Sequence, residues 1–302
     1  MTRALCVNLR HAEPLRRAAA AVLCGVSAAG LVACGSAPPA LNPAQQGAIA
    51  TSQSAARLLA RGDVAQARVQ YERALATAES VEDFALAGAT LLNLALLHGR
   101  AGELAAGHAR LDRILAAPQR YGAALQAQAA TRKALLHLDA PDLGAALAWA
   151  DQAQAACSAP CELGAVLADL RAHVALQRGD FALAAQLATT AAELAVQAGQ
   201  AAEQANALRL QGRARSQLGQ IGEAAAALAQ ALAIDQRLGL PARVALDLLY
   251  AGENEQRRDQ RAAAREFYER ALVVAQAAGL APASEALRSR LLVLGAAVPA
   301  RP

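Results

Sequence analysis

The sequence repeats one short turn pattern six times at nearly constant spacing. The turns are centred on residues 62, 102, 141, 179, 219 and 259, so successive turns lie 38 to 40 residues apart. A small residue lies seven positions before each turn and another lies five positions after it, as Ala55 and Ala67 do around Gly62. A period of this length is typical of an array in which each unit is one supersecondary element packed on its neighbours. The repeat constrains the fold more than any other feature of the chain.

Each unit is predicted to be a pair of α-helices. The hydrophobic fraction of 55% comes largely from alanine, the strongest helix former, and aromatic residues make up only 3%. Glycine or proline at the turn would end the first helix, and a polar neighbour can cap the second. Tyr71 and Tyr268 are expected to fill the gap against the next repeat. The composition therefore predicts an all-α fold with twelve repeat helices.

These units resemble the tetratricopeptide repeat, in which antiparallel helix pairs stack into a right-handed superhelix. The resemblance covers about residues 44–278 and rests on the turns and the small residues around them. The standard unit has about 34 residues, so this chain resembles the long-unit variants. Residues 283–295, with Leu287, Leu291 and Leu294 on one face, are predicted to form a helix that caps the last repeat. The alternative is a generic alanine-rich helical bundle.

The N-terminal region resembles the precursor of a bacterial lipoprotein. Leu31-Val32-Ala33-Cys34 is similar to the lipobox at which such precursors are cut and acylated on cysteine. A basic leader and an apolar run over residues 18–33 precede it, and that run is short for a membrane span. The resemblance implies a signal peptide over 1–33, lipidated Cys34 with a flexible tether over 34–43, a repeat domain over 44–295 and a frayed tail over 296–302. The alternative is a buried helix or short anchor with an ordinary cysteine.

Lipoprotein sorting and charge refine this prediction. Gly35, rather than aspartate, follows Cys34, which by resemblance favours the periplasmic face of the outer membrane over that of the inner membrane.

The chain has 29 basic and 25 acidic residues, a net charge of +4, and residues 1–33 hold four arginines and one glutamate. Loss of the leader would leave a net charge near +1. This charge and the few aromatic residues argue against a nucleic-acid partner.

Two further cysteines, Cys157 and Cys161, lie in the segment Cys-Ser-Ala-Pro-Cys between the third and fourth repeats. In an oxidising compartment two neighbouring cysteines are expected to pair. A metal site would need more ligands than this segment offers, and a redox motif usually has two intervening residues. A structural disulfide is therefore predicted, with a redox role as the alternative.

The first helices of such solenoids line the concave face, so their polar residues are the predicted contacts to a partner. The predicted partner-binding residues are Asp169, His173, Asn206, Arg209, Arg213, Glu253 and Arg257. An apolar stretch with Leu92 and Leu96 lies on an earlier first helix, and this combination would suit an extended peptide or an amphipathic helix. The alternative for each residue is an ordinary solvated side chain.

The sequence offers no catalytic constellation and predicts no cofactor or metal. Four histidines after the leader are scattered without a nucleophile or metal-binding pair, and the glycines lie at repeat turns. The single lysine, Lys133, does not support the carboxylate clamp of chaperone-binding repeats. The predicted function is a non-enzymatic adaptor in an envelope complex that assembles outer-membrane proteins, pili or peptidoglycan. The alternatives are a periplasmic sensor for a small ligand or peptide, and a cytoplasmic signalling scaffold in which Cys34 stays unmodified.

Overall fold

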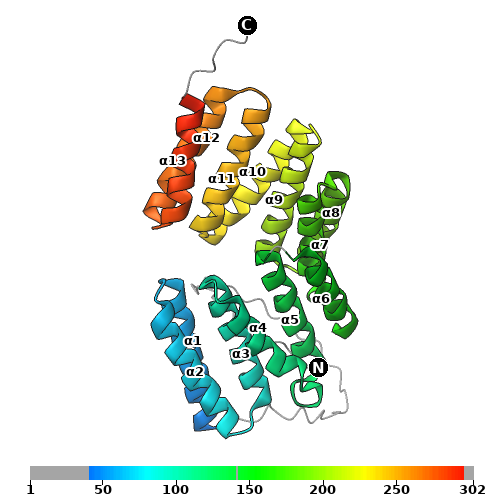
Figure 1. Ribbon diagram of the computed structural model, residues 1–302, viewed down its shortest axis with the longest axis vertical. Coiled ribbons are helices and arrows are strands. Elements are labelled where there is room, and N and C mark those ends of the chain that lie inside the picture. The colour runs from blue at the N-terminus through cyan, green and yellow to red at the C-terminus, as the bar shows by residue number, and fades with distance from the viewer. Residues whose placement is uncertain (1–40, 141, 296–302) are drawn as a thin grey trace, which may run out of the picture. The chain divides into compact units, whose positions relative to one another are not determined.

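A computed structural model describes residues 41–140 and 142–295, and these residues form thirteen α-helices and no strand (Figure 1). The helices are α1 (Pro43–Ala60), α2 (Val64–Ser80), α3 (Phe84–Arg100), α4 (Leu104–Leu115), α5 (Pro118–Asp139), α6 (Leu143–Ala156), α7 (Gly164–Arg178), α8 (Phe181–Gln197), α9 (Ala201–Gln217), α10 (Ile221–Leu238), α11 (Pro241–Arg257), α12 (Arg261–Ala277) and α13 (Ala281–Gly295). The all-α prediction is confirmed. The predicted signal peptide, Cys34, most of the tether and the tail lie outside the described residues.

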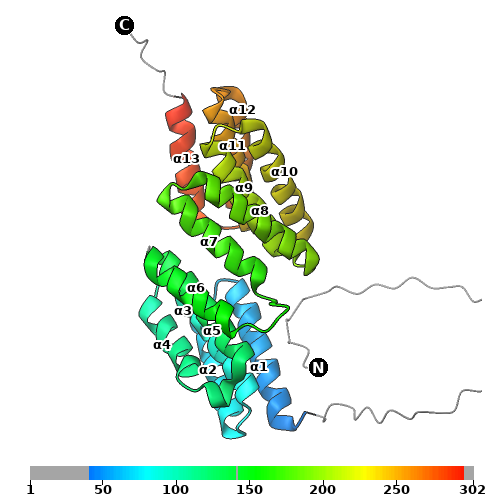
Figure 2. The ribbon, with the colours of Figure 1, turned by 90° about the vertical axis from the view of Figure 1, so that its right-hand side faces the viewer.

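Helices α1 to α12 form six pairs, and the six predicted turns lie between the members of each pair. Each helix packs on the next one in the chain, as the two views in Figures 1 and 2 show for α7, α8 and α9. None of the helices in the described part of the chain combines the length and apolar character needed to cross a membrane.

Left-handed backbone geometry explains the glycine at most turns. Gly62, Gly102, Gly179 and Gly219 have φ angles between +74° and +84°, a region that residues with a Cβ atom seldom adopt. In the sixth repeat Asp259 takes the equivalent position with a φ of +59°. Aspartate tolerates this conformation better than most residues, which accounts for the one repeat turn without glycine or proline.

Side-chain capping of the second helices is less regular than the sequence suggested. Asp63 accepts a hydrogen bond from the backbone N–H of Gln66 at 3.1 Å, and Asp142 accepts one from Ala145 at 3.1 Å. The corresponding polar residues of the other four repeats make no such bond: Glu103, Asp180, Gln220 and Gln260. The turns therefore depend on backbone geometry more than on caps.

The small residues of the repeat are the points of closest helix approach. All twelve are buried, and two of the glycines leave no room for a side chain. A Cβ atom on Gly252 would lie 2.4 Å from Cε1 of Tyr268, and one on Gly212 would lie 2.6 Å from Cγ of Leu228. The sequence predicts that Tyr268 packs against the following unit. In the structure its ring also fills the space over Gly252 of its own repeat, which the sequence pattern does not predict.

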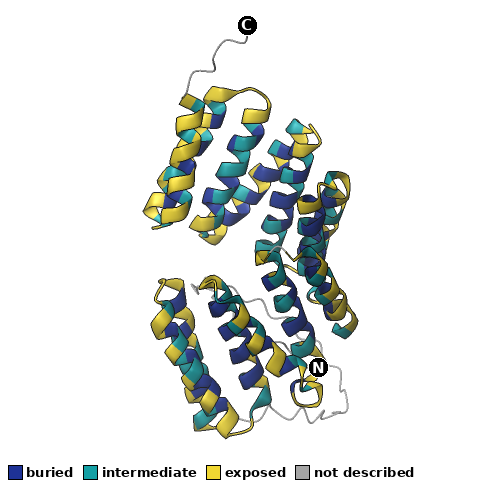
Figure 3. Cartoon of the chain, viewed as in Figure 1, coloured by how far each residue is buried: buried dark blue, intermediate teal, exposed yellow. Residues whose placement is uncertain are grey.

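The hydrophobic core is a series of clusters along the array. One cluster joins α1 to α5, others join α5 to α7, α7 to α9 and α8 to α10, and the last joins α10 to α13. Figure 3 shows buried residues on the sides that face neighbouring helices. Leu287 of α13 is buried, with Leu291 and Leu294 partly buried beside it, so the predicted capping helix is confirmed.

The second and third repeats depart from the regular pattern. Helix α4 has only 12 residues, and α5 is interrupted at Gly122, where φ is +66° and ψ is 167°. Tyr121, the residue before the break, lies edge-on against Phe84, with ring centroids 6.3 Å apart. A hollow of about 340 Å³ opens beside the two rings.

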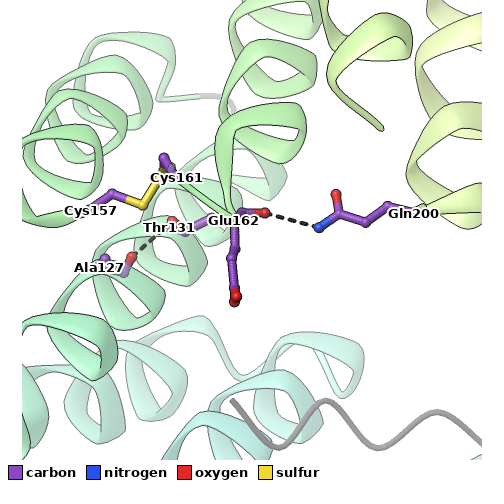
Figure 4. The surroundings of a disulfide bond; sticks show 6 residues. All are labelled: Ala127, Thr131, Cys157, Cys161, Glu162 and Gln200. Atoms are coloured by element: carbon purple, nitrogen blue, oxygen red, sulfur yellow. Dashed lines mark hydrogen bonds between the residues drawn. A yellow bond between two sulfur atoms is a disulfide. The ribbon is translucent and has the colours of Figure 1, made fainter. Parts of the chain in front are cut away.

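The disulfide lies at the junction between α6 and α7, as predicted. Cys157 follows α6 and Cys161 precedes α7, and their Cα atoms are 5.4 Å apart in the bonded pair (Figure 4). Helices α6 and α7 pack on each other less extensively than any other consecutive pair. Gln200 Nε2, at the start of α9, donates a 3.0 Å hydrogen bond to the Glu162 carbonyl and holds the same loop.

Candidate functional site

Polar side chains gather on three neighbouring first helices, α7, α9 and α11. Helix α9 packs on both α7 and α11, so residues on these helices can meet across the interfaces. We call the following set the polar first-helix surface: Asp169 and His173 on α7, Glu203, Asn206 and Arg213 on α9, and Arg243 and Tyr250 on α11. Asn206 Nδ2 donates to Glu203 Oε2 at 2.9 Å, and Arg243 donates to the carbonyl of Ala202 at 3.1 Å. Charge interactions link Asp169 with Glu203 and Arg243.

Arg213 is a cation of this surface that forms no ion pair with an acidic side chain of the described residues. Its guanidinium carbon lies 4.4 Å from the centre of the Tyr250 ring, and the residue is partly buried. Among the described residues it makes no ion pair or hydrogen bond. Stacking on an aromatic face restrains a guanidinium while its N–H groups stay available to an anion. Arg213 is therefore oriented to bind a carboxylate or a phosphate group.

His173 lies within range of the Arg213 charge. Burial lowers the pKa of His173 from its ordinary value of 6.5, Arg213 lowers the pKa further, and Asp139 at the end of α5 opposes both. The imidazole is therefore neutral near pH 7, with one nitrogen as donor and the other as acceptor.

Asp169 carries an unsatisfied acceptor. Its Oδ1 atom is shielded from solvent and accepts no hydrogen bond from the described chain. Burial raises the pKa of this carboxyl to about 7, Glu203 raises it as well, and Arg209 and Arg243 oppose the shift. A shielded carboxyl with an unpaired oxygen and a raised pKa is typical of functional sites, because it contributes little to the stability of the fold.

Replacing Asp169 with asparagine is expected to stabilise the fold at pH 8. The native carboxyl binds a proton up to about pH 7, whereas the unfolded one releases it near its ordinary value of 3.8. The free energy of unfolding therefore falls as pH rises between these values. Since the residue is partly exposed, we expect a gain of about 1–2 kcal/mol at pH 8 and none at pH 4. Urea denaturation at both pH values tests this, with exposed Asp151→Asn as the matched control. An equal pH dependence in the wild type and Asp169→Asn would contradict it.

Arg209 does not lie on this surface, which corrects the prediction from sequence. It is only 6% exposed, and its guanidinium donates from Nε to Asp247 Oδ1 at 2.6 Å, from Nη2 to Asp235, and from Nη1 to Asn206 Oδ1 at 2.9 Å. Carboxyl groups on α10 and α11 draw the side chain inward. Arg209 therefore joins α9, α10 and α11 and is not available to a partner.

Comparisons with known proteins bear on the fold. No family model matches the sequence, and no curated protein matches it. A solved Rap protein in complex with competence and sporulation factor has a TM-score of 0.57 and 10% identity, over 82% of this chain and 77% of that one. A signal-transduction ATPase with a tetratricopeptide repeat sensor, from Pyrococcus horikoshii, has a TM-score of 0.62 and 11% identity, over 82% of this chain and 36% of that one. PilW, a type IV pilus biogenesis factor, has a TM-score of 0.54 and 19% identity, over 83% of this chain and 100% of that one.

The described chain has a tetratricopeptide-like fold. The predicted helical solenoid is thereby confirmed, and α7, α9 and α11 are the first helices of its fourth, fifth and sixth repeats.

The remaining predicted contact residues either pair with another helix or make no side-chain hydrogen bond or ion pair among the described residues. Glu253 pairs with Arg290 of the capping helix at 2.7 Å. Arg257 is exposed and makes no hydrogen bond or ion pair within the described residues. Leu92, expected to give the surface an apolar end, is buried in the first core cluster. The structure thus places Asp169, His173, Asn206 and Arg213 on the neighbouring first helices α7 and α9 of the tetratricopeptide-like fold.

Sequence reasoning missed several residues of this region. They are Glu203, Asp235, Arg243, Asp247 and Tyr250. A signal existed for Asp247, which interrupts the apolar run Ala245–Leu249. An acid in an apolar helical stretch indicates a buried partner, because an unpaired buried carboxylate is costly. Within the described residues no group of three or more histidine, cysteine or acidic side chains is placed to hold a metal ion.

Proposed function

We propose that this protein is a non-catalytic adaptor that binds a segment of a partner protein along the polar first-helix surface. The observation that carries the proposal is Arg213, which is stacked on Tyr250 and has no acidic partner among the described residues. Asp169, on the neighbouring first helix, adds a carboxyl oxygen without a hydrogen bond. Polar groups arranged in this way are costly in a free protein and become satisfied when a partner supplies the complementary groups.

The chemistry favours a peptide segment over a substrate. The surface offers a fixed guanidinium, a neutral imidazole and carboxyl acceptors, which can bind side chains and backbone groups of an extended or helical segment. It offers no nucleophile paired with a general base. An amphipathic or extended segment that crosses from α7 to α11 would meet each of these groups in turn.

Substituting Arg213 with glutamine is expected to abolish most partner capture. A hydrogen bond to a charged group contributes about 1.5–3 kcal/mol, so we expect at least about tenfold less crosslinked partner. The measurement is quantitative mass spectrometry after crosslinking in cells that express the full chain. Arg257→Gln is the matched control, because Arg257 is an exposed arginine on α11 whose side chain makes no hydrogen bond or ion pair in the described residues. Recovery of the same partners in equal amounts from Arg213→Gln would count against this surface.

We further propose that residues 1–33 are removed and that Cys34 is acylated, which would hold the adaptor at the periplasmic face of the outer membrane within an envelope complex. The lipobox-like sequence Leu31-Val32-Ala33-Cys34 supports this location. A disulfide between Cys157 and Cys161 is compatible with an oxidising compartment. The fold shared with PilW supports pilus assembly as one candidate process, beside outer-membrane protein assembly and peptidoglycan assembly.

Replacing Cys34 with alanine is expected to remove both the lipid and the membrane attachment. Stable anchoring by the N-terminal acyl groups would be lost entirely, because they would all be attached at this residue. The test is metabolic labelling with an alkyne fatty acid, followed by fractionation of inner and outer membranes. Cys24→Ala should leave labelling unchanged. A wild-type chain that takes up no label and stays in the cytoplasm would favour the cytoplasmic alternative.

A further inference from the structure

Two carboxyl groups bind the single guanidinium of Arg209. Nε donates to Asp247 Oδ1 at 2.6 Å and Nη2 donates to Asp235 Oδ2. Arginine often binds both oxygens of one carboxylate, whereas here the two donors bind different residues, one on α10 and one on α11. Asp235 also acts on Asp247 through its charge and at hydrogen-bond range, so the two carboxyl groups lie close together.

This pair is buried with too few positive charges. Asp235 is 0% exposed and Asp247 is 1% exposed. One oxygen of each, Asp235 Oδ1 and Asp247 Oδ2, is shielded from solvent and accepts no hydrogen bond from the described chain. Two ionised carboxylates so close together, with one guanidinium between them, repel each other strongly in a poorly solvated place.

The surroundings do not supply the missing positive charge. The third donor of Arg209, Nη1, binds the Asn206 amide oxygen. The charged groups that act on Asp247 are Arg209 and Asp235, so the pair has a single cation. On the other side of Arg209, its charge acts on Asp169 of α7 together with the charges of Glu203 and Arg243, and Arg243 donates to the carbonyl of Ala202.

We propose that Asp235 and Asp247 hold one proton between them, and that this proton fastens α9, α10 and α11 together in mildly acidic solution and is released as the pH rises. With the proton in place, one carboxylate balances Arg209 and the other carboxyl becomes a hydrogen-bond donor. The stability of the packing between the fifth and sixth repeats thus depends on pH. This inference does not depend on the proposed adaptor function.

The direction of the pH effect follows from the pair's surroundings. Burial raises the pKa of Asp247 from 3.8 to about 6, Arg209 opposes the shift, and Asp235 adds to it. Because the native state keeps the proton where the unfolded state has lost it, the free energy of unfolding falls as pH rises from about 4 to about 6.

The test compares the full-length wild type with Asp235→Asn, Asp247→Asn and the double variant by urea denaturation at pH 5 and pH 8. An asparagine amide mimics the protonated carboxyl, because its oxygen can face Arg209 while its N–H group donates to the remaining carboxylate. Each single variant is expected to have a higher denaturation midpoint than the wild type at pH 8 and a flatter pH response. The double variant is expected to be less stable at both pH values, because Arg209 is then buried without a counterion.

If Asp235 and Asp247 instead formed two independent ion pairs with Arg209, the change in denaturation midpoint of the single variants would have the opposite sign. In that case each single variant would be less stable than the wild type at pH 8, and this result would overturn the proposal. Asp151→Asn, which alters an exposed ion pair with Arg171, is the control. A second measurement needs no variant: hydrogen exchange of α10 and α11 in the wild type, corrected for intrinsic rates, should quicken by about fivefold or more between pH 5 and pH 8. Protection that is unchanged over this range would also overturn it.

Discussion

Replacing Arg209 with leucine is expected to lower the free energy of unfolding by about 3–5 kcal/mol at pH 8, the usual cost of removing one partner from a buried ion pair. The variant leaves Asp235 and Asp247 buried without a cation, and both carboxyl groups are almost fully shielded from solvent. The loss should be smaller at pH 5, because each carboxyl can then become neutral by taking up a proton.

Chemical denaturation of the full chain at the two pH values measures this effect. Arg257→Leu is the matched control and should change stability by less than about 0.5 kcal/mol, because Arg257 is exposed. A triple variant with leucine at 209, 235 and 247 should recover part of the loss, since an apolar cluster of similar volume often replaces a buried ion network. Equal stability of Arg209→Leu and the wild type would show that the network contributes nothing.

Replacing Gly252 with alanine is expected to lower the free energy of unfolding by about 1–3 kcal/mol. In an ordinary helix this change stabilises by about 0.5–1 kcal/mol. Here the new Cβ atom would lie 2.4 Å from Cε1 of Tyr268, whose ring is fully buried. The ring is also held by its hydroxyl, which donates to Gln256 Oε1 at 3.0 Å. Helix α12 would therefore have to move away from α11.

Thermal and urea denaturation measure this effect, with Gly47→Ala as the control. A Cβ atom on Gly47 would meet no heavy atom within 4 Å, so that variant should be as stable as the wild type or more so. Combining Gly252→Ala with Tyr268→Leu should restore part of the loss, because the smaller side chain frees the space. If Gly252→Ala alone raised the stability, the close approach of α11 and α12 would be refuted.

The repeat architecture could be predicted from sequence because its determinants are local. A glycine in the left-handed region at each turn and small residues at fixed distances from it specify where helices end and where they touch. The break in α5 was not predicted, because the pattern was taken from what the six repeats have in common. Pro118 and Gly122 were visible, but an average taken over six repeats hides a departure confined to one of them.

The site was predicted only in part because side-chain direction depends on distant partners. Asp169, His173, Asn206 and Arg213 were found from their place on the first helices. The same rule placed Arg209 on the surface, whereas its carboxyl partners lie 26 and 38 residues away on other helices. Tyr250, which orients Arg213, carries no sequence signal of that role. The lipidation of Cys34 stays a prediction, since it lies outside the described residues.

The division of the core into successive clusters affects how the molecule would come apart. Stability in such an array is a sum of intrinsic terms for each unit and coupling terms between nearest neighbours, as in a one-dimensional chain of spins. The coupling between the third and fourth units is the weakest, because α6 and α7 pack least extensively. Unfolding should therefore occur in two transitions, one for the first three repeats and one for the last three, with the disulfide at the boundary between them. Reducing the disulfide should mainly change how strongly these two transitions are coupled.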